Sequence, residues 1–425
     1  MTRPSSTTRA RFLAMFALVL AGEMIFALPF HVPRYFRASM LASFDLSNAA
    51  LGDVFAVYGV TAMLAYFPGG ALADRLPARG LLVTSLLATA LGGVYLATLP
   101  GRAGLALLYG YWGVTTILLF WAAMIRTTRE WGGQSAQGRA FGILDGGRGL
   151  AAAAFATLGV WCFSHYAGAD HLDTALDADS RRRAMRAVIV YYSLATTVAA
   201  LLVWRLVPLV EESRDAPARV QWRTLTAVLR MRAVWLQALV VVAAYCGYKG
   251  LDNYALYAHQ VLGFSETASA GLGAAAAYIR PLAAFGAGLM ADRIGVARSV
   301  GLLFAVSVLV YGLLGVLAPS AGTLTLIYAN LFVSCAAVFA LRGVYFALLE
   351  ECAVPRHLTG SAVGLVSVIG YTPDIFFGAV SGRLLDAAPG LAGHQHYFIL
   401  LALIAIIGGG AALWLLRARS AAARA

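Results

Sequence analysis

The chain has few charged residues for its length. Of 425 residues, only 12% are Asp, Glu, Lys or Arg, against about 25% in an ordinary soluble domain. Hydrophobic residues make up 60%, and the mean hydropathy is +0.76. One buried core cannot hold that much apolar material, so much of it must face lipid. The composition therefore excludes an ordinary soluble domain and indicates an integral membrane protein.

Lysine and cysteine are also scarce. Among 32 positively charged residues, Lys249 is the single lysine, and the four cysteines are scattered without a Cys-x-x-Cys pair. No disulfide framework is indicated. Most arginines lie in the segments between apolar runs and on one side of the membrane. The net charge of +12 therefore reports orientation rather than a nucleic-acid partner.

Several chemical motifs are absent. The chain has no P-loop, which argues against transport driven by ATP, and no nucleophile elbow or zinc-protease helix motif, so we expect no enzyme activity. The polar residues of one outer loop, His165, Asp170, His171 and Asp173, match no compact metal site. We expect neither a metal nor a cofactor.

Apolar runs of about 20 residues, each long enough to cross the bilayer, divide the chain into twelve predicted helices. The runs are too long and too uniformly apolar for barrel strands, so the fold class is all-α. The predicted spans are 12–33, 48–69, 80–99, 104–125, 140–163, 187–208, 233–257, 266–289, 299–318, 323–349, 361–381 and 397–416.

With twelve spans, the basic segments fall on one side, which places both termini in the cytoplasm. The organisation is then a six-helix bundle over 1–208, a cytoplasmic link over 209–232 and a second six-helix bundle over 233–425. Within the link, 220–225 is either an amphipathic helix at the headgroups or part of a solvated hinge.

One short pattern occurs twice. Gly70–Arg75 (GALADR) returns as Gly288–Arg293 (GLMADR), each time between two apolar runs and followed by another arginine. The repeat indicates two similar halves. Each glycine suits a close approach of helices, and Asp74 and Asp292 suit a helix N-terminus or a loop arginine. The pattern is either a latch that moves two helices together or a plain tight turn.

Six plus six spans with this motif resemble the major facilitator superfamily. The motif residues that match are Gly70, Leu72, Asp74, Arg75 and Arg79, then Gly288, Asp292, Arg293, Gly295 and Arg298. The segments 341–351 and 364–378 are similar to a branch that includes sugar-phosphate permeases and nitrate/nitrite carriers. The resemblance implies two pseudo-symmetric bundles, alternating access around a central site and a bacterial inner-membrane location.

Ionisable residues inside a span are costly, so each indicates a function or a pairing partner. They fall in spans one, five, seven, eight, ten and eleven, most of which line the cavity in the resembled family. We predict the following substrate-binding residues: Arg280, Lys249, Arg148, Tyr278, Tyr245, Tyr248 and Asn253. The predicted proton-coupling residues are Glu23, Asp145, Asp374 and Asp252. The predicted latch residues are Gly70, Asp74, Arg75, Arg79, Gly288, Asp292, Arg293 and Arg298.

Other pairings remain open. Lys249 and Asp252 form either a cavity group or a structural pair, and Arg148 either contacts substrate or is neutralised by Asp145. Arg280 is either a substrate ligand or the partner of Asp374 or Glu23.

The leading hypothesis is a secondary transporter for a small organic anion, a sugar phosphate, sulfonate or carboxylate, taken up with protons. One alternative is an exporter of amphipathic or toxic compounds in the same fold. Another, from a different class, is a receptor or scaffold without flux, whose charges would pair off internally. We expect a monomer in the lipid bilayer.

Overall fold

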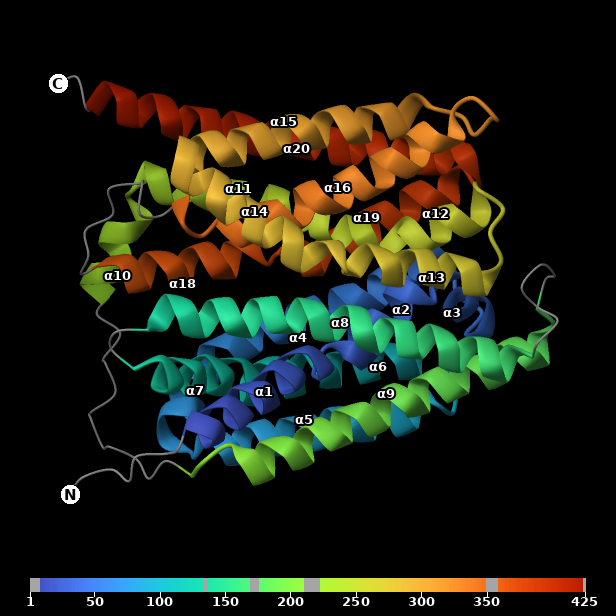
Figure 1. The fold of residues 1–425 in the computed structure, drawn as a ribbon, viewed down its shortest axis with the longest axis horizontal. Helices are drawn as coiled ribbons and strands as arrows, with labels where there is room; N and C mark the ends of the chain where they lie inside the picture. The colour runs from blue at the N-terminus through green and yellow to red at the C-terminus, as the bar shows by residue number, and fades with distance from the viewer. Residues whose placement is uncertain (1–7, 134–135, 169–175, 210–221, 349–357, 423–425) are drawn as a thin grey trace. The chain divides into compact units, whose positions relative to one another are not determined.

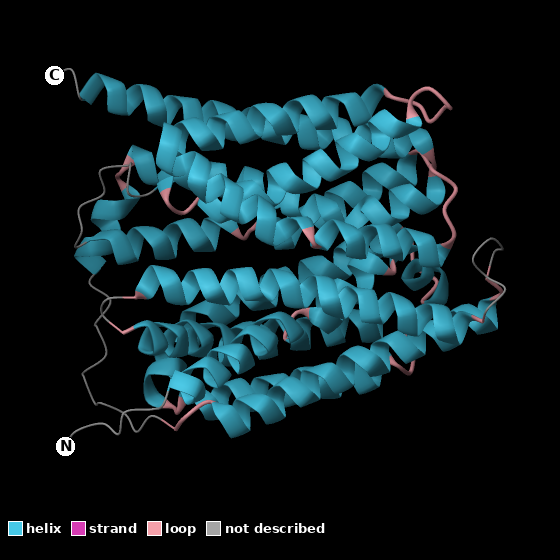
Figure 2. Ribbon diagram, viewed as in Figure 1, coloured by secondary structure: helices cyan, strands magenta, loops and turns pink. Residues whose placement is uncertain are grey.

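The computed structural model describes residues 8–133, 136–168, 176–209, 222–348 and 358–422. Over these residues the secondary structure is helical, without a strand (Figure 2). In this part of the chain, 11 helices are long and apolar enough to span a membrane. A pair bent by 40°, Arg9–Met24 and Ala27–Tyr35, brings the number to 12. Each predicted span overlaps one of these, so the prediction of an all-helical membrane protein is confirmed.

Seven spans are continuous helices, labelled in Figure 1 where there is room. They are α4 (Asn48–Arg75), α5 (Ala78–Leu96), α8 (Gln137–Ala167), α9 (Ala178–Leu206), α15 (Val296–Val316), α16 (Leu324–Val344) and α20 (Leu391–Ala422). The sixth span therefore begins nine residues earlier than expected from 187–208, because its first turns are arginine-rich rather than apolar.

Five spans are interrupted by a short break. The first is α1 (Thr8–Met24), the π-helix η1 (Ala27–His31) and α2 (Val32–Tyr35); the fourth is α6 (Arg102–Val114), the π-helix η2 (Thr115–Trp121) and α7 (Ala122–Gly132). The seventh is α11 (Arg232–Gly250), the 3₁₀ turn η4 (Leu251–Asn253) and α12 (Tyr254–Gln260). The eighth is α13 (Glu266–Ala277) and α14 (Ile279–Ile294), and the eleventh is α18 (Thr359–Gly370) and α19 (Pro373–Ala387). Such breaks within membrane helices occur where the backbone lines a cavity or a binding site.

Two short helices lie between spans: α3 (Arg37–Ser43) and α10 (Trp222–Leu229). The helix α10 covers part of the link segment 220–225, which favours the helical alternative there. Residues 210–221 of the link lie outside the described residues, as do Asp170, His171 and Asp173.

The chain forms two compact units. Unit 1 contains residues 1–46, 57–217 and 264–277, and unit 2 contains residues 47–56, 218–263 and 278–425. Each unit therefore draws most of its residues from one half of the sequence and a short stretch from the other. In unit 1, α9 packs on α5, α8 and α1; in unit 2, α20 packs on α15 and α11.

The repeated motif lies within helices rather than in loops. Gly70–Arg75 forms the last turns of α4, and Gly288–Arg293 lies in the last turns of α14. The turns themselves are shorter than expected: only Leu76 and Pro77 separate α4 from α5, and Gly295, at φ +90°, separates α14 from α15. The left-handed backbone at Gly295 is the conformation for which glycine is needed.

The close helix approach expected at the first glycine of each motif is wrong for this structure. A Cβ added at Gly70 or Gly288 would meet no described atom within 4 Å, whereas one at Gly69 would lie 3.1 Å from the carbonyl oxygen of Leu118. In the first copy, Gly69 rather than Gly70 allows the close helix contact, because Gly69 faces η2 and Gly70 faces outward.

Candidate functional site

Most of the predicted site residues lie at the interruptions of the spans. Asp252 and Asn253 are in η4, Tyr278 separates α13 from α14, and Asp374 is in the first turn of α19. Lys249 is in the last turn of α11. A carboxylate at a helix N-terminus and an ammonium at a C-terminus both interact favourably with the helix dipoles. The breaks thus reduce the cost of holding these charges inside a membrane protein.

In unit 2, two carboxylates surround one ammonium. The Nζ atom of Lys249 lies 3.2 Å from Oδ2 of Asp252 and 3.4 Å from Oδ1 of Asp374. Lys249 is 3% exposed, and its Nζ lies 5.2 Å from the centroid of the Phe55 ring. The pairing of Lys249 with Asp252 is therefore real, and Asp374 contacts the same ammonium to complete a group of three.

An aromatic cluster adjoins this group. The Tyr245 hydroxyl donates to Oδ2 of Asp374 at 3.0 Å, and the Tyr371 ring lies edge-on to Tyr245 at 4.9 Å. The guanidinium of Arg342 stacks on Tyr248, with Cζ 3.8 Å from the ring centroid. Tyr245 and Tyr248 were predicted, whereas Arg342 and Tyr371 join the site through the tertiary structure. Stacking of this kind orients a guanidinium while leaving its N–H edge able to donate.

Unit 1 contains a second group with one cation between carboxylates. The Nε atom of Arg148 donates to Oε2 of Glu23 at 3.2 Å, and its Nη1 lies 4.0 Å from Oδ1 of Asp145. Glu23 is 3% exposed, whereas the Asp145 side chain is 52% exposed. The main partner of Arg148 is therefore Glu23 on another helix, rather than Asp145 on its own.

His31 belongs to the same group and was not predicted. Its Nε2 atom lies 3.2 Å from Oε1 of Glu23, and its side chain is 4% exposed. The rule that selected Glu23, an ionisable residue inside an apolar run, applies equally to His31 at the end of the first predicted span.

The structure also places three other predicted residues. Arg280 is buried in the first turn of α14, and Tyr278, just before it, is 44% exposed. Asn253 is buried, and its Oδ1 has no hydrogen-bond partner among the described residues.

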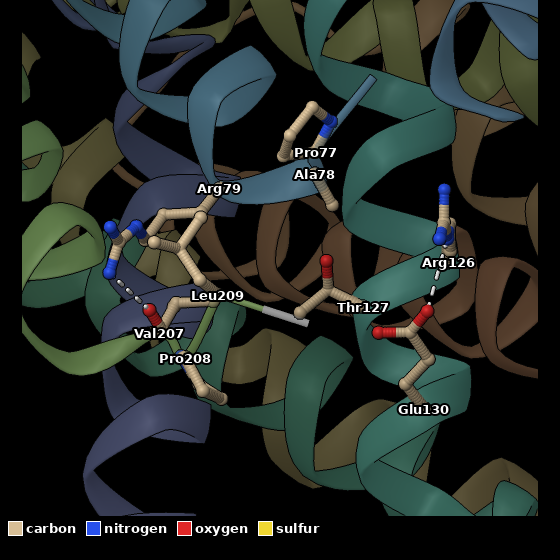
Figure 3. Close-up of a pocket in the computed structure, with 9 residues that line it drawn as sticks. All are labelled: Pro77, Ala78, Arg79, Arg126, Thr127, Glu130, Val207, Pro208 and Leu209. Atoms are coloured by element: carbon tan, nitrogen blue, oxygen red, sulfur yellow. Dashed lines mark hydrogen bonds and ion pairs between the residues drawn. The ribbon is translucent and has the colours of Figure 1, made fainter. Parts of the chain in front are cut away.

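Two arginines next to the first motif copy bind neighbouring helices: Arg126 binds the motif itself, and Arg79 binds the end of α9 (Figure 3). Arg79 donates to the Val207 carbonyl at 3.5 Å, and Arg126 donates to the Ala73 carbonyl at 2.6 Å and pairs with Glu130 at 3.0 Å. The cavity between them is about 10 Å³, room for one water. Asp74 and Asp292 are exposed and form no ion pair with any described residue.

A glycine-lined crossing of α4 and α19 was not predicted either. Gly378 and Gly382, spaced as in a GxxxG pattern, face Gly52 and Asn48, and a Cβ at Gly378 would lie 3.4 Å from the Gly52 Cα. The spacing Gly378-x-x-x-Gly382 could have revealed this contact. The two backbones approach closely because none of the three glycines has a side chain.

Asp386 holds the N-terminus of α4 at this crossing. Its carboxylate accepts from the backbone N–H of Asn48 at 3.1 Å and of Ala49 at 2.7 Å. Beside it, Arg383 Nη1 lies 2.8 Å from Oδ1 of Asp53. A carboxylate from another helix thus satisfies the first N–H groups of α4.

Replacing Asp386 with alanine is expected to destabilise unit 2 by about 1 kcal/mol, the usual effect of losing an N-terminal cap. The measurement is thermal unfolding in detergent. Asp292→Ala is the matched control, because that carboxylate is exposed and has no partner among the described residues; equal melting of the two variants would contradict the capping role.

Comparison with known proteins gives a consistent result. The sequence profile of the Major Facilitator Superfamily matches residues 11–378. The inner membrane protein YihN of Escherichia coli (strain K12) is 27% identical over 439 residues, covering 96% of both chains. The inner membrane protein YqcE of the same organism is 24% identical over 399 residues, covering 92% of this chain and 91% of that protein.

Two solved structures share the fold. A bacterial homologue of the human lysosomal transporter Spinster, inward-facing and unoccupied, aligns with a TM-score of 0.71 at 15% identity, over 97% of this chain and 98% of that chain. The nucleoside transporter NupG aligns with a TM-score of 0.67 at 14% identity, over 96% of this chain and 98% of that chain.

Proposed function

Since the chain belongs to the Major Facilitator Superfamily, we propose that it takes up a small organic anion with protons by alternating access. The protein is a multi-pass transporter of the bacterial inner membrane and not an enzyme. The substrate class and the coupling ion are the parts that we infer from the charged groups.

The observation that carries the proposal is that each unit holds, within its spans, a cation between two carboxylates. In unit 2 the cation is Lys249, and in unit 1 it is Arg148. A receptor or scaffold without flux has no use for ionisable side chains inside its spans, whereas a coupled transporter does. A buried carboxylate that loses its cation to another ligand is expensive unless it can bind a proton.

Coupling follows from competition for the cation. An anionic substrate that binds Arg148 or Lys249 displaces a carboxylate, and the displaced carboxylate then favours its protonated form. Glu23, Asp145, Asp252 and Asp374 are thus the proposed proton carriers. A bound anion leaves a carboxylate without its cation, and a bound proton neutralises that carboxylate. The anion and the proton therefore favour each other's binding.

The proposal that the substrate is an anion depends on the positively charged residues within the spans. Besides Arg148 and Lys249, these are Arg280 in α14 and Arg342 stacked on Tyr248. Guanidinium groups bind phosphate, sulfonate or carboxylate through paired N–H donors, and the tyrosines offer flat surfaces for an attached sugar-like body. The similarity of 341–351 and 364–378 to sugar-phosphate permeases supports the same class.

The repeated motif is proposed as a latch on the cytoplasmic side, comprising Asp74, Arg75 and Arg79 and their counterparts Asp292, Arg293 and Arg298.

The test is a thermal-shift and uptake experiment on the purified protein. Glucose 6-phosphate, 2-hydroxyethanesulfonate and gluconate are the anionic probes, and uridine is the comparator. At least one anion should raise the melting temperature and enter proteoliposomes faster under an inwardly directed proton gradient. Arg280→Ala should weaken that effect at least tenfold. Stabilisation by uridine alone, or by no anion, would overturn the proposal.

A further inference from the structure

An apolar groove lies between α1, α8 and α9 of unit 1, and its volume is about 250 Å³. Its floor includes Met24 of α1 and Ala199 of α9, both of which are buried. Its walls include Leu194 and Val198 of α9, both of which are exposed. Ala195 and Ala199, one turn apart on α9, leave this space open because their side chains are small.

The groove is chemically suited to a hydrocarbon chain. Its one hydroxyl, that of Tyr191, already donates to the Phe155 carbonyl at 3.2 Å, and no charged residue of the described chain lines it. A bound water needs polar partners, whereas an apolar cavity of about 150 Å³ stays dry and takes up benzene. Because the spans lie in a bilayer, the hydrocarbon that reaches this surface is the acyl chain of a lipid.

The helices α1 and α9 run antiparallel beside the groove. The Thr196 hydroxyl of α9 donates to the Met24 carbonyl of α1 at 3.1 Å. Tyr192, which is earlier on α9, contacts the ring of His31, which is later in the first span. The beginning of α1 and the end of α9 therefore lie at the same end of unit 1 (Figure 1).

Each of these two helix ends carries an exposed arginine on the face of the groove. Arg205 follows Leu194 by 11 residues, and Arg9 precedes Leu20 by 11 residues. Eleven residues are about three turns and about 16 Å, so each pair shares a helix face, and one leaflet of hydrocarbon is about 15 Å deep. Neither arginine forms an ion pair with a described residue. The arginines thus lie where the headgroup of a lipid in the groove would be.

The opposite end of α9 does not offer such a place. Eleven residues before Ala195, the same face presents Ala184, which is buried. The exposed Trp204, beside Arg205, also suits the boundary between hydrocarbon and headgroups. The headgroup of a bound lipid therefore belongs at the end of α9 that carries Arg205.

We propose that this groove binds an acyl chain of an anionic glycerophospholipid, whose phosphate contacts Arg205 and Arg9. A guanidinium binds a phosphate through paired N–H donors, and each arginine near the membrane surface favours an anionic headgroup. Close packing holds the acyl chain in the groove, because the surrounding lipid tails are as apolar as the groove itself. The bound lipid links α1, α8 and α9 and stabilises unit 1 without involving the transported substrate.

The test uses the full-length protein, purified in detergent and depleted of lipid. Dioleoyl phosphatidylglycerol is the anionic probe, and dioleoyl phosphatidylcholine, which has the same chains and no net charge, is the comparator. Native mass spectrometry measures lipid binding, and thermal unfolding measures the stabilisation. Wild type should bind one phosphatidylglycerol about tenfold more tightly than phosphatidylcholine, the effect of two arginines near a charged headgroup, and should melt at a higher temperature with it.

Two substitutions separate the acyl chain from the headgroup. Ala195→Phe fills the groove and should weaken the binding of both lipids about tenfold, the effect of losing on the order of ten carbon–carbon contacts. Ala154→Phe is its control, because Ala154 is exposed on α8 and does not line the groove. Arg205→Ala should reduce the preference for phosphatidylglycerol about fivefold. Arg182→Ala, which alters an exposed arginine at the other end of α9, should leave that preference unchanged.

The proposal is overturned if wild type binds both lipids equally, or if Ala195→Phe or Arg205→Ala binds them as wild type does. A protein that carries no lipid but forms a dimer, which Ala195→Phe dissociates, would assign the groove to a second copy of the chain and would also overturn it. Because Arg205 is exposed, Arg205→Ala leaves the packing intact and decides the case in which Ala195→Phe does not fold.

Discussion

Lys249→Ala is expected to abolish uphill uptake and to lower the free energy of unfolding by about 3–5 kcal/mol, the usual cost of removing one partner from a buried ion pair. Asp252 and Asp374 would then lose the ammonium that they share, in a site where Lys249 itself is 3% exposed. The measurements are uptake into proteoliposomes and unfolding of the purified protein.

A second substitution separates stability from function. Lys249→Ala combined with Asp374→Asn removes one charge of each sign, so the double variant should recover most of the lost stability, because the net charge of the group is then the same as in wild type. It should remain inactive, because both the cation and the proton carrier are gone. An active double variant would show that Lys249 serves only to neutralise Asp374. Arg182→Ala is the control, since that arginine is exposed, forms no ion pair with a described residue and is not among the proposed site residues.

Gly52→Ala is expected to reduce uptake more than tenfold and to destabilise the protein by about 1–3 kcal/mol through overpacking. The new Cβ would collide with the backbone carbonyl of Gly378, which cannot turn aside as a flexible side chain can. Because α4 continues from residues 47–56 in unit 2 into unit 1, we expect a change at this crossing to affect the transport cycle as well as stability.

The matched control is Gly286→Ala in α14, where an added Cβ would meet no described atom within 4 Å. Alanine is favoured over glycine in a helix by about 1 kcal/mol, so this variant should be neutral or slightly more stable. Gly52→Ala gains the same helix propensity, so any loss of stability must come from the collision of the new Cβ with Gly378. Equal stability and uptake in both variants would contradict a close crossing of α4 and α19.

The helical spans could be predicted because the bilayer imposes a length and a composition on each. All twelve predicted spans correspond to observed helices, and the error at 187–208 arose where α9 extends beyond its apolar part. The placement of Gly70–Arg75 in a loop was wrong for a related reason. Polar residues at the end of α4 were taken as a turn, although α4 continues through Arg75.

The sequence predicted most of the charged residues of the site, but only some of the contacts between them. Hydropathy alone selects Glu23, Arg148, Lys249 and Asp374 as ionisable residues in apolar runs. Their partners depend on helix rotation and on the breaks within spans, neither of which has a simple sequence signal. Arg148 was considered with Asp145, three residues away on the same helix, yet its shorter contact is to Glu23 on α1.

The sequence by itself determined that this protein is a multi-spanning helical membrane protein with charges placed inside its spans, because a single residue's transfer energy is a local property. The tertiary structure alone decided that His31 meets Glu23, that Lys249 meets two carboxylates and that Gly52 meets Gly378. These contacts join residues separated by a helix break or by a hundred or more positions, and their energies depend on the distances between side chains, which only the folded chain sets.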